Sequence, residues 1–204
     1  MKRLSGKHFW KQPKIEAMKS QAVHVRNYSF GPQDKLFFDA NIWMFLYGPQ
    51  GQNNLPGNRM SVYSSAFSRI LKAQSRIYID VLIVSEFINT YARRKWEIFK
   101  ATDRSGRGSE SFKNFRNSSD FNPVAKEIAD KTRRILKHCR KIESGFEILE
   151  MDSLIKRYEN GGTDFNDQVF MQLCKNREFK LVTDDRDFKN QGISILTANG
   201  RLLR

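Results

Sequence analysis

The sequence predicts an α/β fold, a parallel β-sheet flanked by helices, and two observations favour it. Short apolar runs alternate with segments of helical periodicity, which is the order that builds such a sheet. The run at 36–38 is continuously apolar, as expected of a strand covered on both faces. A chain of 204 residues suits one domain with a substantial core. We expect this domain over residues 35–204, after a basic N-terminal arm or short helix over residues 1–34.

Periodicity defines the elements of the first half. Apolar residues at helical spacing over 42–46, 60–71 and 81–99 predict three helices. A short apolar run, IYI at 77–79, predicts a strand between the second and third helices. The Gly-, Pro- and Asn-rich segment 48–58 predicts the loop that ends the first helix.

Residues 101–121 are rich in Ser, Gly, Asn and Arg and predict a mobile insertion in the domain. Phe112, Phe115 and Phe121 are interleaved with its basic residues. Two interpretations remain open. The rings either stack on the bases of a single-stranded nucleic acid or anchor an ordinary loop to the core.

Capping signals and apolar runs mark the second half. Asn122-Pro123 is a typical helix start, Gly161-Gly162 a typical helix end, and Thr163 a candidate cap for the next helix. Together these signals predict a helix over 122–139, a strand at 146–149, a helix over 152–158, a helix after residue 163 and a strand at 180–182.

The composition points to a polyanionic partner. The formal net charge is +14, and Lys and Arg gain free energy on nucleic acid by releasing its counterions. An anionic membrane surface and a merely solubilising charge are the alternatives, but the basic residues do not flank an apolar anchoring face. The sequence contains no apolar run long enough to span a bilayer and no signal-peptide pattern, so we expect a cytoplasmic protein. The two cysteines and three histidines lack zinc-site spacing.

Asp39 stands where the first strand ends and the first helix begins. In open α/β sheets, ligands bind outside the carboxyl ends of the strands, which favours a functional role for this side chain. The simpler interpretation is that Asp39 only caps the following helix, because Asp is a common N-cap.

Other acids recur at comparable positions. Asp164 and Asp167 are expected in the first turn of one helix, and Asp184 and Asp185 follow the strand at 180–182. Glu86 lies among apolar residues of a predicted helix. Each has an ordinary explanation alone, as a complement to a helix dipole, a polar turn residue or a partner of a nearby arginine.

Taken together, these acids predict a metal site. They are expected at one edge of the sheet, where two carboxylates about 4 Å apart would repel by about 4 kcal/mol at an effective dielectric constant near 20. Such a cluster needs bound cations or partial protonation. Oxygen ligands without Cys or His favour Mg²⁺ or Mn²⁺, the ions of phosphate chemistry.

These motifs resemble the PIN-domain nucleases, a Rossmann-like three-layer family that includes the VapC-like toxin ribonucleases. The resemblance covers roughly residues 35–196 and is carried by FFDANIWMF, SEF, DQVFMQLC and LVTDDRDF. It implies that the catalytic, metal-binding acids are Asp39, Glu86, Asp167 and Asp185. Asp164 and Asp184 are additional acids expected to share ligation, and Thr183, Asn41 and Asp187 are expected to support the ligands. The segments 1–34 and 101–121 depart from the compact toxin pattern.

The first functional hypothesis is therefore an Mg²⁺- or Mn²⁺-dependent endoribonuclease. The resemblance implies RNA as substrate, an antitoxin protein as partner if the chain is a toxin, and a homodimer in which the apolar helix over 60–71 serves as an interface or else as core. The second hypothesis is an RNA-binding module without cleavage activity. A third, a HAD-like phosphatase, is disfavoured because Asn41 replaces the second acid of the D-x-D motif of that family.

Overall fold

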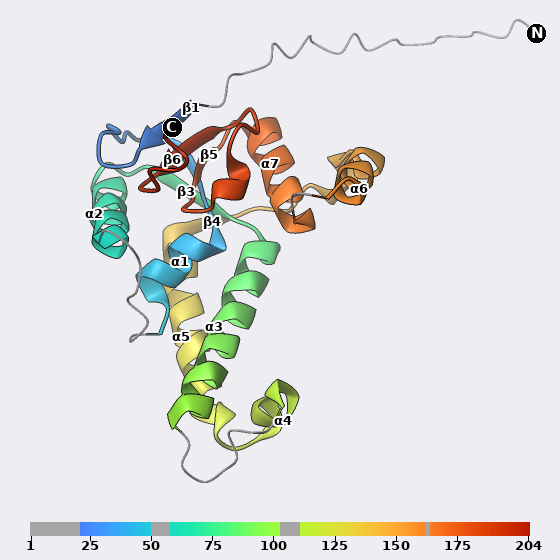
Figure 1. Cartoon of the computed structure of the whole chain (residues 1–204). Coiled ribbons are helices and arrows are strands. Elements are labelled where there is room, and N and C mark those ends of the chain that lie inside the picture. The colour runs from blue at the N-terminus through green and yellow to red at the C-terminus, as the bar shows by residue number, and fades with distance from the viewer. Residues whose placement is uncertain (1–20, 50–57, 103–110, 162–163) are drawn as a thin grey trace, which may run out of the picture.

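The computed structural model describes residues 21–49, 58–102, 111–161 and 164–204, and its centre is a six-stranded, wholly parallel β-sheet flanked by helices (Figure 1). The strand order is β1-β6-β5-β2-β3-β4. This architecture confirms the predicted fold class. The strands are β1 Gln21–His24, β2 Lys35–Phe38, β3 Arg76–Ile79, β4 Cys139–Lys141, β5 Lys180–Val182 and β6 Ser194–Thr197.

Helices connect most of the strands, as parallel pairing requires. No helix in the described ranges is long and apolar enough to cross a membrane. The helices are α1 Ala40–Tyr47, α2 Arg59–Lys72, α3 Val81–Thr102, α4 Phe112–Asn117, α5 Phe121–His138, α6 Met151–Glu159 and α7 Phe165–Arg177, with 3-10 turns η3 Phe146–Ile148 and η4 Arg186–Phe188.

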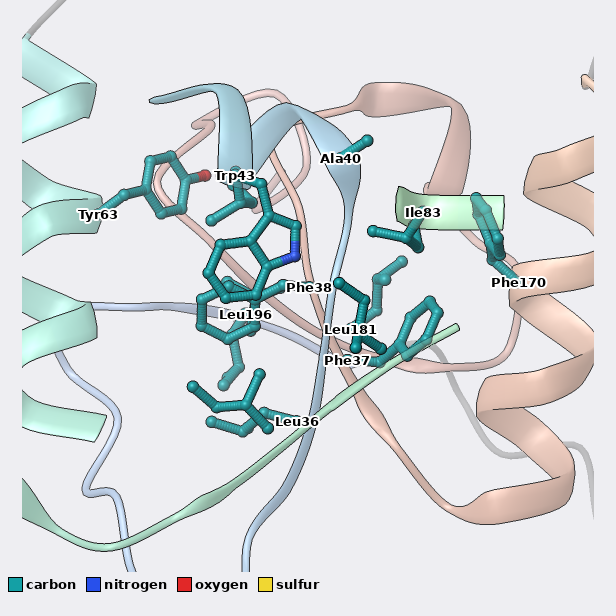
Figure 2. Packing of buried hydrophobic residues seen from close by; sticks show 14 of the residues in the cluster. Leu36, Phe37, Phe38, Ala40, Trp43, Tyr63, Ile83, Phe170, Leu181 and Leu196 are labelled. Atoms are coloured by element: carbon teal, nitrogen blue, oxygen red, sulfur yellow. The ribbon is translucent and has the colours of Figure 1, made fainter. Parts of the chain in front are cut away.

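Strand β2 lies between β5 and β3 at the centre of the sheet. Its residues alternate between the two faces, so Phe38 packs against Trp43 of α1 with ring centroids 4.9 Å apart, whereas Phe37 packs against Phe170 of α7 at 5.7 Å (Figure 2). Both faces of β2 are therefore buried, as its apolar composition predicts. The residue that follows β2 is consequently placed at the middle of the carboxyl edge.

The expected arm over residues 1–34 is wrong for residues 21–34. Strand β1 pairs in parallel with β6, with Gln21 opposite Ser194, and Val25 is completely buried. No sequence pattern marks this strand, because it is short, lies at the sheet edge and carries only two apolar residues. Residues 1–20 lie outside the described residues.

The predicted insertion over residues 101–121 is mostly helical where it is described. Helix α3 runs on to Thr102, and α4 packs on both α3 and α5. The ring of Phe115 lies 5.0 Å from that of Phe99 and 5.5 Å from that of Phe121, centroid to centroid. These contacts favour anchoring over base stacking for the phenylalanines. The three helices form a projecting unit, with α4 far from the sheet (Figure 1); residues 103–110 are not described.

Three local predictions are wrong or displaced. The apolar run at 146–149 is the 3-10 turn η3, with Phe146 66% exposed. The strand in this part of the chain is instead the polar Cys139–Lys141, which pairs with β3 at the edge of the sheet. An edge strand needs no apolar pattern when its backbone pairs on one side only. Helix α5 begins one residue early, at Phe121, and Asp164 caps α7 where Thr163 was expected. The predicted loop over 48–58 and Thr163 lie largely outside the described residues.

Candidate active site

Asp39 marks the point where β2 leaves the sheet. Its backbone N–H donates to the carbonyl oxygen of Val182 at 3.1 Å, and its own carbonyl oxygen accepts from the N–H of Ile42 at 3.0 Å, which begins α1. Its side chain makes no capping hydrogen bond to α1 and is directed elsewhere. Oδ2 accepts from the Thr183 hydroxyl at 2.6 Å and from Nδ2 of Asn41, although the residue is only 5% exposed. Helix capping therefore does not account for this carboxylate.

Thr183 and Asn41 join the end of β2 to the end of β5. The fully buried Thr183 hydroxyl also accepts from the backbone N–H of Asp185 at 2.9 Å. Oδ1 of Asn41 accepts from the N–H of Asp184 at 3.4 Å. The two predicted supporting residues thus fix the positions of the two strand-end acids relative to each other.

Three further elements contribute carboxylates whose charges act on Asp39 or on one another. Glu86 comes from α3, Asp164 and Asp167 from the start of α7, and Asp185 from the turn after β5. Burial, followed by the charges of Asp39 and the other acids, raises the pKa of Glu86 to about 7 and that of Asp167 to about 8. Burial also raises the pKa of Asp39 to about 6, and the charge of Asp185 adds to it. The fold therefore brings together the acids that the sequence predicted separately; we call these five residues the acid cluster.

Asp80 is an acid next to this cluster that was not among the predicted site residues. It follows β3 directly, is 2% exposed, and its charge contributes to the raised pKa of Glu86. Its Oδ1 accepts from the N–H of Ile83 at 3.0 Å, whereas within the described residues its buried Oδ2 has no hydrogen-bond partner. The signal was present in the sequence, because an acid directly after an apolar strand is also what distinguishes Asp39.

The other two predicted acids have different surroundings. The carboxylate of Asp184 lies 2.6 Å from Nη1 of Arg59 and accepts from the Tyr63 hydroxyl at 2.9 Å. Asp187 is exposed in η4, with Oδ1 4.0 Å from Nε of Arg186. The partners of Asp184 come from α2, and no sequence motif linked that helix to the acids.

The donors of the acid cluster fit a hard divalent cation. They are carboxylate oxygens, and Oδ2 of Asp39 is held by hydrogen bonds from a hydroxyl group and an amide nitrogen. Oxygen ligands suit Mg²⁺ or Mn²⁺ better than Zn²⁺. Burial and the charges of the neighbouring carboxylates raise the pKa of Glu86 and of Asp167, and a bound cation would favour the charged forms of both. In the part of the chain that the structure describes, no three acidic, His or Cys side chains converge closely enough to hold one ion as they stand. Ligation of one ion by three of these carboxylates would therefore require side-chain rotation.

A pocket of about 360 Å³ opens beside the acid cluster and shares Asp185 with it. Three of its lining residues are arginines and one is an aromatic residue from α1. We refer to it as the arginine pocket. Its lining consists of Asn41, Phe45, Arg59, Asp184, Asp185, Arg186, Asn199 and Arg201.

The fold and the acid cluster together define a class, the α/β proteins with carboxylates gathered at the carboxyl edge of a parallel sheet. Within this class, the family model for the PIN domain matches residues 36–193, and the chain belongs to the PIN-domain family. Proteins of this family are generally nucleases, which are hydrolases. The resemblance predicted from the sequence motifs is thereby confirmed.

A solved structure shares the fold. The crystal structure of VapBC2 from Rickettsia felis, bound to a DNA fragment from their promoter, aligns with a TM-score of 0.50 at 12% sequence identity. The alignment covers 80% of this chain and 98% of that one. At this identity the similarity concerns the fold alone. No curated protein matches the sequence.

Proposed function

We propose that this chain is an Mg²⁺- or Mn²⁺-dependent endoribonuclease that hydrolyses RNA phosphodiester bonds. The observation that carries the proposal is the acid cluster, in which the burial and mutual charge of Asp39, Glu86 and Asp167 raise all three pKa values. Such carboxylates are poised to exchange protons for a cation. Structural ion pairs do not account for them, because the strongest charges acting on Glu86 and Asp167 are other carboxylates.

We assign Asp39, Glu86, Asp167 and Asp185 as the ligands and catalytic acids. Asp164, the N-cap of α7, is the additional acid best placed to share ligation, because its charge acts on both Glu86 and Asp167. The bound ions would activate a water for in-line attack and neutralise the charge on the phosphoryl oxygens.

Asp184 has a structural role in this proposal, although it was predicted as an additional acid that shares ligation. Both of its carboxylate oxygens are engaged, one by Arg59 and the other by Tyr63. Its ligation would require breaking a partly buried ion pair, which costs more than rotating a solvated side chain.

The remaining residues of the site position the ligands and control their protons. Thr183 and Asn41 hold Oδ2 of Asp39 in one orientation, which predefines the centre of the ligand set. Near neutral pH, Glu86 and Asp167 retain part of their protons without a cation, since their pKa values are about 7 and about 8. Cation binding therefore releases protons, and affinity should rise with pH.

Net charge and family membership support two proposals about binding partners. A net charge of +14 suits a polyanionic substrate such as RNA. We also propose a protein partner of the antitoxin class, on the strength of the fold shared with VapBC2. A homodimer remains a prediction, but α2 is a poor candidate for its interface because the apolar residues Val62, Ala66 and Ile70 are buried within the domain.

Cleavage of a fluorescently labelled single-stranded RNA, measured with Mg²⁺ and with EDTA, tests the proposal. We expect EDTA to abolish cleavage and Asp39→Asn or Asp167→Asn to reduce it by about a hundredfold or more, because each variant removes a central ligand. The matched control is Asp130→Asn, which makes the same charge change at an exposed residue of α5 outside the acid cluster. Undiminished cleavage by Asp39→Asn, with the fold confirmed by circular dichroism, would overturn the assignment.

One observation favours the alternative of an RNA-binding module without cleavage activity: within the described ranges, no three potential ligands converge on one point. That alternative predicts salt-sensitive RNA binding and no metal-dependent product. The HAD-like phosphatase hypothesis is abandoned because the chain belongs to the PIN-domain family. Asn41 is also bound to Asp39 and Thr183 and holds no proton for acid catalysis.

A further inference from the structure

We propose that the arginine pocket is a nucleotide subsite for single-stranded RNA, in which Arg186 and Arg201 bind a backbone phosphate and the ring of Phe45 stacks on the neighbouring base. The inference rests on the proposed function for the choice of RNA. It adds a binding site that lies next to the acid cluster and uses different residues. The pocket combines cationic and aromatic groups, the pairing by which proteins hold single strands.

The balance of charge in the pocket favours an anion. Arg59 and Asp184 form a short ion pair, with side chains 22% and 10% exposed, and largely neutralise each other. Asp185 also lines the pocket, but its single negative charge is outnumbered by the two remaining arginines. The guanidinium groups of Arg186 and Arg201 are left to set the charge of the pocket.

Both of these guanidinium groups are available to a ligand. Arg186 is exposed, and within the described ranges its one ion-pair partner is Asp187, at the limiting distance of 4.0 Å. Among the described residues, no carboxylate lies within ion-pairing distance of the side chain of Arg201, which is also exposed. The planar, forked guanidinium group matches the oxygens of a phosphate and donates two hydrogen bonds at once.

Phe45 forms a fixed aromatic platform in the same pocket. Its ring stacks on that of Tyr63, with centroids 5.6 Å apart and planes at 21°. The Tyr63 hydroxyl in turn accepts from the N–H of Ala198 at 2.8 Å and donates to Asp184 at 2.9 Å. One face of the Phe45 ring is thus packed against Tyr63, while Phe45 itself is partly exposed and lines the pocket. A ring fixed by packing loses little conformational entropy when a base stacks on it.

The loop that carries Arg201 is anchored to the loop after β5. Nδ2 of Asn199 donates to the carbonyl oxygen of Asp184 at 2.6 Å, and its Oδ1 accepts from the N–H of Arg201 at 3.1 Å. The pocket volume, about 360 Å³, falls in the range of small-molecule sites and suits a single nucleotide. Because Asp185 belongs to both sites, a strand bound at the acid cluster can place its adjacent nucleotide in the pocket.

Binding of a fluorescein-labelled single-stranded RNA oligonucleotide, measured by anisotropy in EDTA at several salt concentrations, tests the subsite without requiring cleavage. We expect Arg186→Gln and Arg201→Gln each to weaken binding by roughly threefold to tenfold and to reduce the salt slope by about 1. Phe45→Leu, which keeps an apolar side chain, should weaken binding by about tenfold with an unchanged slope. The matched control Arg177→Gln makes the same charge change in the last turn of α7 and should bind normally.

A fully paired duplex of the same sequence distinguishes stacking from charge. Phe45→Leu should leave duplex binding unchanged, because paired bases are not free to stack on the ring, whereas the arginine variants should weaken it. The subsite is overturned if the Arg186→Gln/Arg201→Gln double variant binds the single strand as the wild type does, or if Arg177→Gln weakens binding equally. Both arginines are exposed, so these variants are expected to fold normally.

Failure of the subsite and failure of the proposed function give different results. If the wild type cleaves no RNA and the double variant still loses binding, the subsite stands and the endonuclease assignment falls. If cleavage depends on Asp39 and the double variant binds normally, the endonuclease stands and the subsite falls.

Discussion

The hydroxyl group of Thr183 donates to Oδ2 of Asp39 across 2.6 Å and thereby ties the end of β5 to the end of β2. The same oxygen of Thr183 accepts from the backbone N–H of Asp185. One hydroxyl group thus sets the positions of two proposed ligands that are far apart in the sequence. Changing it should alter the site without removing any carboxylate.

Thr183→Val should impair the site through Asp39. The hydrogen bond from Thr183 lowers the pKa of Asp39 against the effect of burial, so its loss should move that pKa above its present value of about 6. We expect RNA cleavage to fall by about tenfold to a hundredfold and the acid limb of its pH profile to shift to higher pH. Thr183→Ser keeps the hydroxyl group and should stay close to wild type. A pH profile unchanged by the valine variant would contradict this role.

The stability of the metal-free protein should decrease as the pH rises from about 4 to 8. Asp39, Glu86 and Asp167 have folded pKa values of about 6, 7 and 8, above the value of about 4 expected when unfolded. A raised carboxyl pKa stabilises the fold fully below the unfolded pKa, and this contribution is lost as the pH passes the folded pKa. The total should be on the order of 2–4 kcal/mol, because the groups are coupled and partly solvated.

Thermal unfolding in EDTA at pH 5 and pH 8 measures this dependence. Asp167→Asn should flatten it, since it removes the group with the largest shift. Added Mg²⁺ should raise the melting temperature at the higher pH and have little effect at the lower one, where protons occupy the carboxylates. A stability that rises with pH over this window would contradict the proposed uncompensated charge of the acid cluster.

Asp80→Ser should leave stability unchanged or raise it by about 1 kcal/mol at pH 8. Serine keeps an acceptor for the N–H of Ile83 and removes both the buried charge and the oxygen that has no partner among the described residues. Asp80→Ala, which also loses the acceptor, is the control and should cost about 1 kcal/mol relative to serine. Urea unfolding of the wild type and the two variants measures their order of stability. A serine variant as destabilised as the alanine variant would contradict the prediction.

Asp184→Asn and Asp185→Asn should have opposite effects. Loss of the Asp184 charge leaves Arg59 without its partner and should cost about 1–3 kcal/mol of stability with little change in Mg²⁺ affinity. Loss of the Asp185 charge should weaken Mg²⁺ binding and stabilise the metal-free fold, because that charge raises the pKa of Asp39 and of Asp167. Thermal melts and Mg²⁺ titrations of both variants separate the two roles, and equal losses of Mg²⁺ affinity would refute the distinction.

The fold class was predictable because the central strands are buried on both faces. The apolar residues of β2 and of β5 are a direct consequence of that burial. The edge strands β1 and β4 were not predictable in this way, because their positions depend on backbone pairing with β6 and β3 and not on apolar patterning. The apolar run at 146–149 was misleading because exposed turns also carry such residues.

The acid cluster was predictable as a set of strand-end and helix-start acids, but the partner of each acid was not. The ion pair between Asp184 and Arg59 joins residues on α2 and after β5, and only the folded chain shows which of two adjacent aspartates is engaged. The arginine pocket likewise gathers side chains from the first helix and from the chain after β6. The residues that make up such sites are brought together by the topology of the fold, and patterns within a single sequence do not predict them.

The pairing of β1 with β6 has a consequence for the order in which the molecule is made. Gln21 lies opposite Ser194, and Asp39 is hydrogen-bonded to Thr183, which also binds the turn that carries Asp185. Strands β1 and β2 can therefore make these contacts only when the segments after residue 180 are present. Contacts between residues so far apart in sequence form late, because closing the long loop loses conformational entropy before the contacts themselves stabilise the chain. During synthesis, a partly made chain that lacks β5 and β6 has no assembled acid cluster. The proposed nuclease would acquire its active site only after β5 and β6 have left the ribosome.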